Sequence, residues 1–102
     1  MKRPFGVSTV IEIKSGMCIH KFPLTYTRNT IELSDGATVL AAQCQNDIVT
    51  LLALVDTNAR KVARTFIVKG TGHFFYHIHN VTYVGTCQDS TQLVWHVFEL
   101  LK

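Results

Sequence analysis

The stretch ATVLAAQCQNDIVTLLALV, residues 37–55, decides the fold of this chain. Two largely apolar runs, Ala37–Gln45 and Ile48–Val55, flank the pair Asn46-Asp47. Asparagine and aspartate tolerate the positive φ angles of a two-residue turn between antiparallel strands. The pattern therefore predicts a β-hairpin. Because Ala53–Val55 is apolar on both faces, we expect the second strand of this hairpin to lie in the centre of a sheet.

Short runs with a period of two continue along the rest of the chain, and turn residues such as Gly, Asn, Asp and Ser separate them. Pro23 has no amide hydrogen, so it ends its strand or places that strand at a sheet edge. Leu93–Phe98 is apolar on both faces and indicates a second central strand. The runs predict further strands at Val7–Lys14, Met17–Phe22, Thr30–Leu33, Val62–Lys69, Val81–Cys87 and Gln92–Leu100.

No helix longer than a single turn at Thr57–Lys61 is indicated, because no other segment has the helical spacing of apolar residues. The fold class is therefore predicted to be all-β. We expect a single small antiparallel barrel or a two-layer sandwich of about seven strands, connected as a meander.

The composition fits one domain that spans residues 1–102. Hydrophobic residues make up 47% and charged residues 17%, which excludes an intrinsically disordered chain. No apolar run reaches the roughly 18 residues that cross a bilayer, and no signal-peptide pattern is present. We expect a cytoplasmic protein that does not contact a membrane, with residues 1–6 as a flexible basic arm. The formal charge of +3 permits an anionic partner without indicating one.

The three cysteines, Cys18, Cys44 and Cys87, have no CxxC spacing and lie in apolar surroundings. Their odd number and their spacing favour reduced thiols that pack as small hydrophobic residues over a disulfide framework. Burial raises the pKa of a thiol and makes it a poor nucleophile. No GxSxG or HExxH motif occurs, so we expect no enzymatic activity and no cofactor. The isolated carboxylates are interpreted as solvated residues of strands: Glu12, Glu32 and Glu99.

Histidines gather between residues 73 and 79 and raise a metal-binding hypothesis. His77 and His79 are two residues apart, so their rings point the same way if the segment is extended. His73, His20 or His96 could supply a third ligand, but nothing in the spacing requires one. We favour the alternative, in which these imidazoles make local hydrogen bonds and no metal binds.

The segment Gly70-Thr71-Gly72-His73 resembles the start of a phosphate-binding glycine loop. It lacks the lysine of a P-loop, and no predicted helix follows it. We interpret the two glycines as the point where the chain bends sharply out of its strand. The amides exposed at such a bend could still hold an anion.

Phe74, Phe75 and Tyr76 stand where turn residues would be expected, in the loop Gly70–Asn80. Loops of this length run over the surface, and an aromatic cluster facing solvent is unfavourable unless something covers it. The cover could be the protein's own sheet, a second copy of the chain in a homodimer, or a foreign partner. Aromatic side chains with a polar edge are common energetic anchors of interfaces.

Basic residues gather at Arg60, Lys61 and Arg64, at the start of a predicted strand. They could contact the phosphates of a nucleotide or a nucleic acid. Positive charge that protects an edge strand from aggregation explains the same pattern and is the explanation we favour.

Seven segments stand out along the chain: IHKFPL (19–24), TIEL (30–33), LALVD (52–56), RTF (64–66), GTGH (70–73), YVGT (83–86) and LVWHVFE (93–99). Together they resemble a family of small uncharacterised phage and prophage proteins. The similarity runs from about Cys18 to Glu99, and the first seventeen residues fall outside it. The resemblance implies no reaction and no catalytic residues.

This resemblance implies a small phage protein that works by occupancy, in the cytoplasm of the infected bacterial host cell. The leading expectation is an inhibitor of an antiviral defence system, an anti-CRISPR protein that blocks a Cas nuclease or ribonucleoprotein complex by direct contact. One alternative is a sponge that sequesters a nucleotide immune signal, as anti-CBASS or anti-Thoeris proteins do. Another is an accessory virion protein. The expected contact surface combines Phe74, Phe75, Tyr76 and His77 with Arg60, Lys61 and Arg64.

Overall fold

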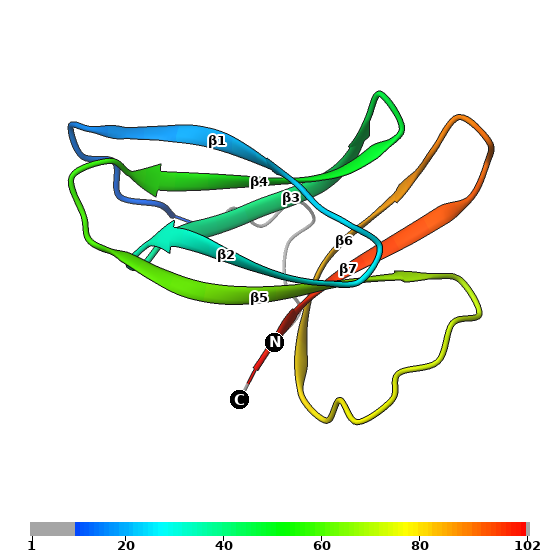
Figure 1. The fold of residues 1–102 in the computed structure, drawn as a ribbon. Coiled ribbons are helices and arrows are strands. Elements are labelled where there is room, and N and C mark those ends of the chain that lie inside the picture. Colours follow the sequence, from blue (N-terminus) through cyan, green and yellow to red (C-terminus); the bar gives the residue numbers. More distant parts are fainter. Residues whose placement is uncertain (1–9, 102) are drawn as a thin grey trace, which may run out of the picture.

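The protein is a two-layer β-sandwich in a computed structural model that describes residues 10–101 (Figure 1). One sheet has three strands in the order β1-β4-β3, and the other has four in the order β2-β5-β7-β6. Every pairing is antiparallel. The strands are β1 (Met17–Pro23), β2 (Arg28–Ser34), β3 (Thr38–Gln45), β4 (Ile48–Asp56), β5 (Lys61–Gly70), β6 (Val81–Gln88) and β7 (Val94–Leu100).

The all-β prediction is confirmed, and of its two forms the structure is the sandwich and not the closed barrel. The predicted meander is wrong. β1 pairs with β4, and β2 pairs with β5, so each strand finds a partner three strands later in the chain. This order arises because the short connection between Pro23 and Arg28 carries the chain from one layer to the other.

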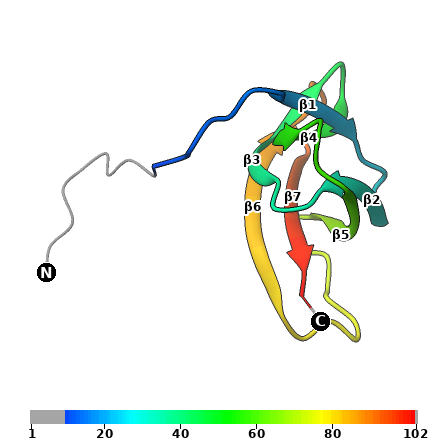
Figure 2. The ribbon, with the colours of Figure 1, turned by 90° about the vertical axis from the view of Figure 1, so that its left-hand side faces the viewer.

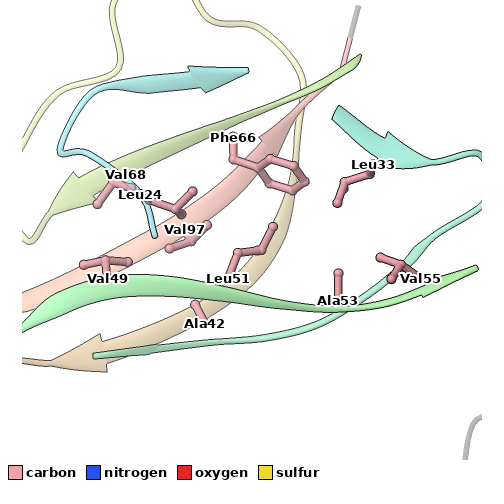
Figure 3. Packing of buried hydrophobic residues seen from close by; sticks show 10 residues of the cluster. All are labelled: Leu24, Leu33, Ala42, Val49, Leu51, Ala53, Val55, Phe66, Val68 and Val97. Atoms are coloured by element: carbon pink, nitrogen blue, oxygen red, sulfur yellow. The ribbon is translucent and has the colours of Figure 1, made fainter. Parts of the chain in front are cut away.

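The core lies between the two sheets and consists of side chains from alternate positions of the strands (Figure 3). Phe66 is the largest side chain that is fully buried, and it packs among Leu33, Leu51 and Val97 in one cluster. Burying apolar surface at about 25 cal/mol per Å² is the main favourable term that holds the two layers together.

The hairpin predicted at residues 37–55 is confirmed as β3 and β4. Asn46 and Asp47 have φ angles of 50° and 64°, the left-handed conformation that a two-residue hairpin turn requires. β4 is the central strand of its sheet, and β7 is one of the two inner strands of the other sheet, as the apolar segments 53–55 and 93–98 predicted. Pro23 is the last residue of β1, which is an edge strand.

Two local predictions are wrong. No strand forms at residues 10–14, the described part of the run Val7–Lys14, because nothing pairs with this segment and the side chains of Val10 and Ile13 are exposed (Figure 2). Alternation of residues marks a segment that could be a strand, but a strand also needs a hydrogen-bonding neighbour. Thr57–Lys61 makes a turn and no helical turn.

The arm expected at residues 1–6 lies outside the described residues. Between residues 10 and 101 there is no helix long and apolar enough to span a bilayer.

The two hairpin tips at one end of the sandwich are tied together by side chains. Asp47 of the β3–β4 turn accepts hydrogen bonds from the amide and the hydroxyl of Ser90, at 2.8 and 2.6 Å. In the β6–β7 turn, Asp89 accepts hydrogen bonds from the Thr91 hydroxyl, the Leu93 amide and the Trp95 Nε1 at 2.6 to 3.0 Å. These donors hold the pKa of Asp89 below its usual value.

Replacing Asp89 by asparagine is expected to lower the melting temperature at pH 7. The melting temperature of this variant should also change less with pH in the acid range. A carboxyl with a lowered folded-state pKa stabilises the fold above the unfolded pKa, near 3.8, and this stability is lost as the pH falls through the folded value. The wild-type melting temperature should therefore fall more steeply than that of the Asp89→Asn variant below pH 4. Thermal unfolding followed by circular dichroism between pH 7 and pH 2.5 measures both curves.

Asp35→Asn is the matched control, because the carboxylate of Asp35 is exposed and paired on the surface with Arg60. Parallel pH profiles for Asp89→Asn and the wild type would contradict the role assigned to Asp89.

Candidate partner-binding surface

The loop of residues 71–80 joins β5 to β6 and projects beyond the sandwich at the lower right of Figure 1. Its aromatic side chains are open to solvent: Phe74 is 71% exposed, Tyr76 70% and Phe75 43%. We call these three residues the aromatic surface. Phe74 and Tyr76 are thus largely exposed, as expected from the sequence, and Phe75 is partly covered.

Hydrogen bonds to the backbone of this loop hold both of its ends against the sheet. The Lys69 ammonium donates a hydrogen bond to the Phe74 carbonyl at 2.8 Å, and the Leu101 amide donates to the Asn80 carbonyl at 3.0 Å. At the start of the loop the Thr71 amide donates to the Val94 carbonyl at 3.2 Å. The loop therefore presents its aromatic side chains from an ordered frame, which lowers the entropy lost on binding.

Phe75 connects the loop to the outer face of the four-stranded sheet. Its ring meets the Phe98 ring edge-on, with 5.3 Å between centroids, and the exposed Tyr83 lies 5.6 Å from Phe98 on the neighbouring strand. The Lys69 ammonium lies 5.4 Å from the centroid of the Phe75 ring, in cation–π geometry. Aromatic and cationic groups thus form one continuous patch from the loop onto β6 and β7.

Lys69 is the cation that the sequence-based surface missed. It belongs to the outward-facing residues of β5, and its register partner on β7 is His96. Its position at the end of β5, five residues before Phe74, is the sequence signal that could have identified it.

The structure does not bring Arg60, Lys61 and Arg64 to the aromatic surface. Arg60 and Lys61 lie at the opposite end of β5 from Lys69, which places them roughly 26 Å away at the ordinary rise of a strand. Arg60 makes an exposed ion pair with Asp35, at 3.2 Å between Nε and Oδ2. Arg60 and Lys61 therefore do not surround the aromatic surface, because most of the ten-residue strand β5 separates them from it.

Arg64 has a structural role between the two layers. Its Nε and Nη2 donate to the two carboxylate oxygens of Glu99 at 2.6 and 2.7 Å, and its Nη1 donates to the Ala37 carbonyl at 2.7 Å. The carboxylate holds the pKa of Arg64 above its ordinary value. The sequence-based interpretation of Glu99 as an isolated, solvated carboxylate is therefore wrong.

His77 and His79 in the loop are not arranged as a pair of neighbouring metal ligands. His77 has a φ angle of 59°, so the segment is not extended there, and the argument that His77 and His79 point the same way fails. The Nδ1 of His73 accepts a hydrogen bond from the Gly70 amide at 3.1 Å. Across residues 10–101 no group of three or more His, Cys, Asp or Glu side chains is arranged to hold a metal ion.

His96 lies in a chain of hydrogen bonds beside the loop. Its Nε2 is 2.7 Å from the Thr71 hydroxyl, and its Nδ1 is 3.0 Å from the Thr86 hydroxyl. Thr86 is in turn 2.6 Å from the hydroxyl of Tyr83. This chain fixes the first residue of the loop to β6 and β7, a positioning role that the sequence did not suggest.

The glycine segment forms the bend that was expected of it. Gly72 has a φ angle of 92°, and a Cβ added to Gly70 would lie 2.8 Å from the His73 ring. A pocket of about 340 Å³ lies beside the bend, next to Trp95 and Leu93. Tyr26 already stacks on Trp95, with 4.3 Å between centroids. Because no lysine or arginine is among the residues that line this pocket, it does not suit a nucleotide phosphate.

The cysteines differ from one another in a way that the sequence did not predict. Cys18 is exposed on β1 and is not the buried thiol expected there. Cys44 and Cys87 are half-buried, and burial together with the neighbouring Cys44 raises the pKa of Cys87 to about 12. A thiol with such a pKa carries almost no thiolate at neutral pH.

A family model described as a domain of unknown function, DUF7352, matches residues 17–102. The chain belongs to this family. The matched region starts at the first residue of β1 and contains all seven strands of the sandwich, so the DUF7352 domain includes the aromatic surface. Comparisons with curated proteins and with solved structures find no match.

Proposed function

We propose that this DUF7352 protein is a non-enzymatic binding protein that docks on a macromolecular partner through Phe74, Phe75, Tyr76 and His77, with Lys69 as the adjacent cation. One observation carries the proposal: Phe74 and Tyr76 are largely exposed on a loop whose backbone is held at both ends. Aromatic side chains presented in this way supply large contact area at low entropic cost, which is typical of interface anchors.

The proposed partner is a CRISPR nuclease or ribonucleoprotein complex in the cytoplasm of a phage-infected bacterium. The resemblance to small phage proteins supports this class of partner. The positive charge of the protein supports a partner whose contact surface is negative. Lys69 and the formal charge of +3 favour a surface of negative potential. The nucleotide sponge is less well supported, because the pocket beside Trp95 offers no cation for a phosphate.

Replacing Phe74 and Tyr76 together by alanine is expected to weaken partner binding by about 100-fold while leaving the melting temperature within a few degrees of wild type. Each exposed anchor contributes at least about tenfold to affinity when its ring enters a partner pocket, and neither ring contributes to the core. The measurement is inhibition of DNA cleavage by a purified Cas nuclease with its guide RNA, titrated with each variant.

Ile19→Ala is the control, because Ile19 is also exposed but lies on β1 in the other sheet. It should inhibit as well as wild type. Failure of the wild-type protein to bind or inhibit nuclease complexes at several salt concentrations would refute the proposed partner. A concentration-dependent dimer that the double variant abolishes would show instead that a second copy covers the aromatic surface.

A further inference from the structure

Cys44 and Cys87 meet across the two layers of the sandwich. The Cys44 thiol lies within hydrogen-bonding distance of Cys87, with 2.8 Å between the two Sγ atoms. The two residues are 43 positions apart in the chain and lie on β3 and β6, which belong to different sheets. No local sequence spacing could have paired them.

The surroundings hold this pair of thiols together. β3 and β6 lie side by side (Figure 2), and β6 approaches β3 so closely that a Cβ on Gly85 would lie 3.2 Å from the backbone nitrogen of Ala42. Three positions beyond each cysteine, the hydrogen bonds between Asp47 and Ser90 tie the adjoining hairpin tips. The approach of the two sulfur atoms is therefore fixed by contacts on both sides of them.

We propose that Cys44 and Cys87 are a redox site, which a low-molecular-weight disulfide such as oxidised glutathione converts into a disulfide bond between the sheets. This inference concerns the stability of the fold and does not depend on the proposed function.

The reaction is an ordinary thiol–disulfide exchange in two steps. The Cys44 thiol loses its proton, and its sulfur attacks one sulfur of glutathione disulfide, which releases one glutathione thiolate and leaves a mixed disulfide on Cys44. The Cys87 thiol then loses its proton, and its sulfur attacks the Cys44 sulfur and displaces the second glutathione. Two protein thiols are oxidised to one disulfide, and one molecule of oxidised glutathione is reduced to two thiols, so electrons and protons balance.

Cys44 is assigned the first attack because a negative charge is less favourable on Cys87. Burial is the main cause that disfavours a negative charge on Cys87, and the adjoining Cys44 and the carboxylate of Asp89 add to it. Cys87, already at 2.8 Å, is then the resolving thiol.

The disulfide would close a loop of the unfolded chain between residues 44 and 87 and so restrict the unfolded state. A loop of this length corresponds to an expected rise in melting temperature of roughly 10–20 °C. Because β3 and β6 are edge strands of their sheets, the bond would also oppose separation of the two layers on that side.

The test is to incubate the reduced, folded protein with oxidised glutathione and follow intact mass, free thiols and melting temperature. We expect the mass to fall by about 2 Da, the number of free thiols to fall from three to one, and a proteolytic peptide pair to link Cys44 with Cys87. The rise in melting temperature should vanish when dithiothreitol is added.

Cys44→Ala and Cys87→Ala should each lose the mass change and the thermal shift, whereas Cys18→Ala should keep both, because Cys18 is on an exposed position of β1. Retention of glutathione as a stable adduct on Cys44 or Cys87, or dimers joined through Cys18 with no internal link, would overturn the proposal. An internal link with no change in melting temperature would overturn its claim on stability.

Discussion

Replacing Phe66 by alanine is expected to lower the free energy of unfolding by about 3–5 kcal/mol. Phe66 is on β5 and has no exposed surface, and its ring lies in the cluster that joins the two sheets (Figure 3). The substitution removes most of a buried ring and leaves a cavity that strands fixed by hydrogen bonds on both sides cannot fully close. The total free energy of unfolding of a small domain is about 5–15 kcal/mol, so this single change should bring the protein close to unfolding.

Urea denaturation followed by Trp95 fluorescence measures this loss, and Phe74→Ala is its matched control. The two variants lose the same ring, but Phe74 is mostly exposed, so its replacement should change the free energy of unfolding by no more than about 0.5 kcal/mol. Equal losses for the two variants would show that the loop of residues 71–80 is buried in solution. That result would remove the basis of the proposed binding surface as well as the expected difference.

The β-hairpin and most strands could be predicted from the sequence because they depend on neighbours along the chain. Alternation of apolar residues determines which side chains of a strand share a face, and Ile31 and Leu33 do point together into the core side of β2. Asn46-Asp47 determines the turn because its left-handed φ angles are a local property. The loop of residues 71–80 was recognised for a similar reason, because three consecutive aromatic residues interrupt a strand pattern.

The pairing of strands could not be predicted in this way, because a period of two says nothing about which strand lies beside which. The sequence did not reveal that β1 pairs with β4, nor that β3 packs against β6, which places Cys44 beside Cys87 across the sandwich. The same limit applies to the contact surface. Arg60, Lys61 and Arg64 form one basic group along the chain, but the extended strand places Arg60 and Lys61 at the end of β5 remote from the loop of residues 71–80.

The ion pair between Arg64 and Glu99 is the clearest case in which pairing changes the role of a residue. Arg64 is on β5 and Glu99 on β7, and their side chains are only 23% and 16% exposed. The same guanidinium donates to the Ala37 carbonyl, in the segment that leads into β3 of the other sheet. One side chain therefore links three segments, and its removal would leave a half-buried carboxylate with no cation beside it.

Replacing Arg64 by methionine is expected to lower the free energy of unfolding by about 2–3 kcal/mol, below the 3–5 kcal/mol of a fully buried pair because water still reaches this one. Glu99→Gln should cost less, since the amide oxygen of glutamine can still accept a hydrogen bond from the Arg64 guanidinium. In the double variant Arg64→Met/Glu99→Gln the losses should not add, and the coupling free energy from a double-mutant cycle in urea measures the pair.

Arg60→Met tests whether burial is what gives the Arg64 pair its value. Arg60 and Asp35 make an ion pair through one nitrogen, with side chains that are 77% and 53% exposed, so this variant should lose no more than about 0.5 kcal/mol. Equal effects at the two arginines would contradict the structural role of Arg64.

Arg64 faces the interior, so the Arg64→Met variant should still inhibit the partner at temperatures where the variant is folded. Lys69 faces the aromatic surface, so the Lys69→Met variant should bind the partner less tightly without losing stability. The two basic residues of one strand would then separate folding from binding in a single pair of measurements.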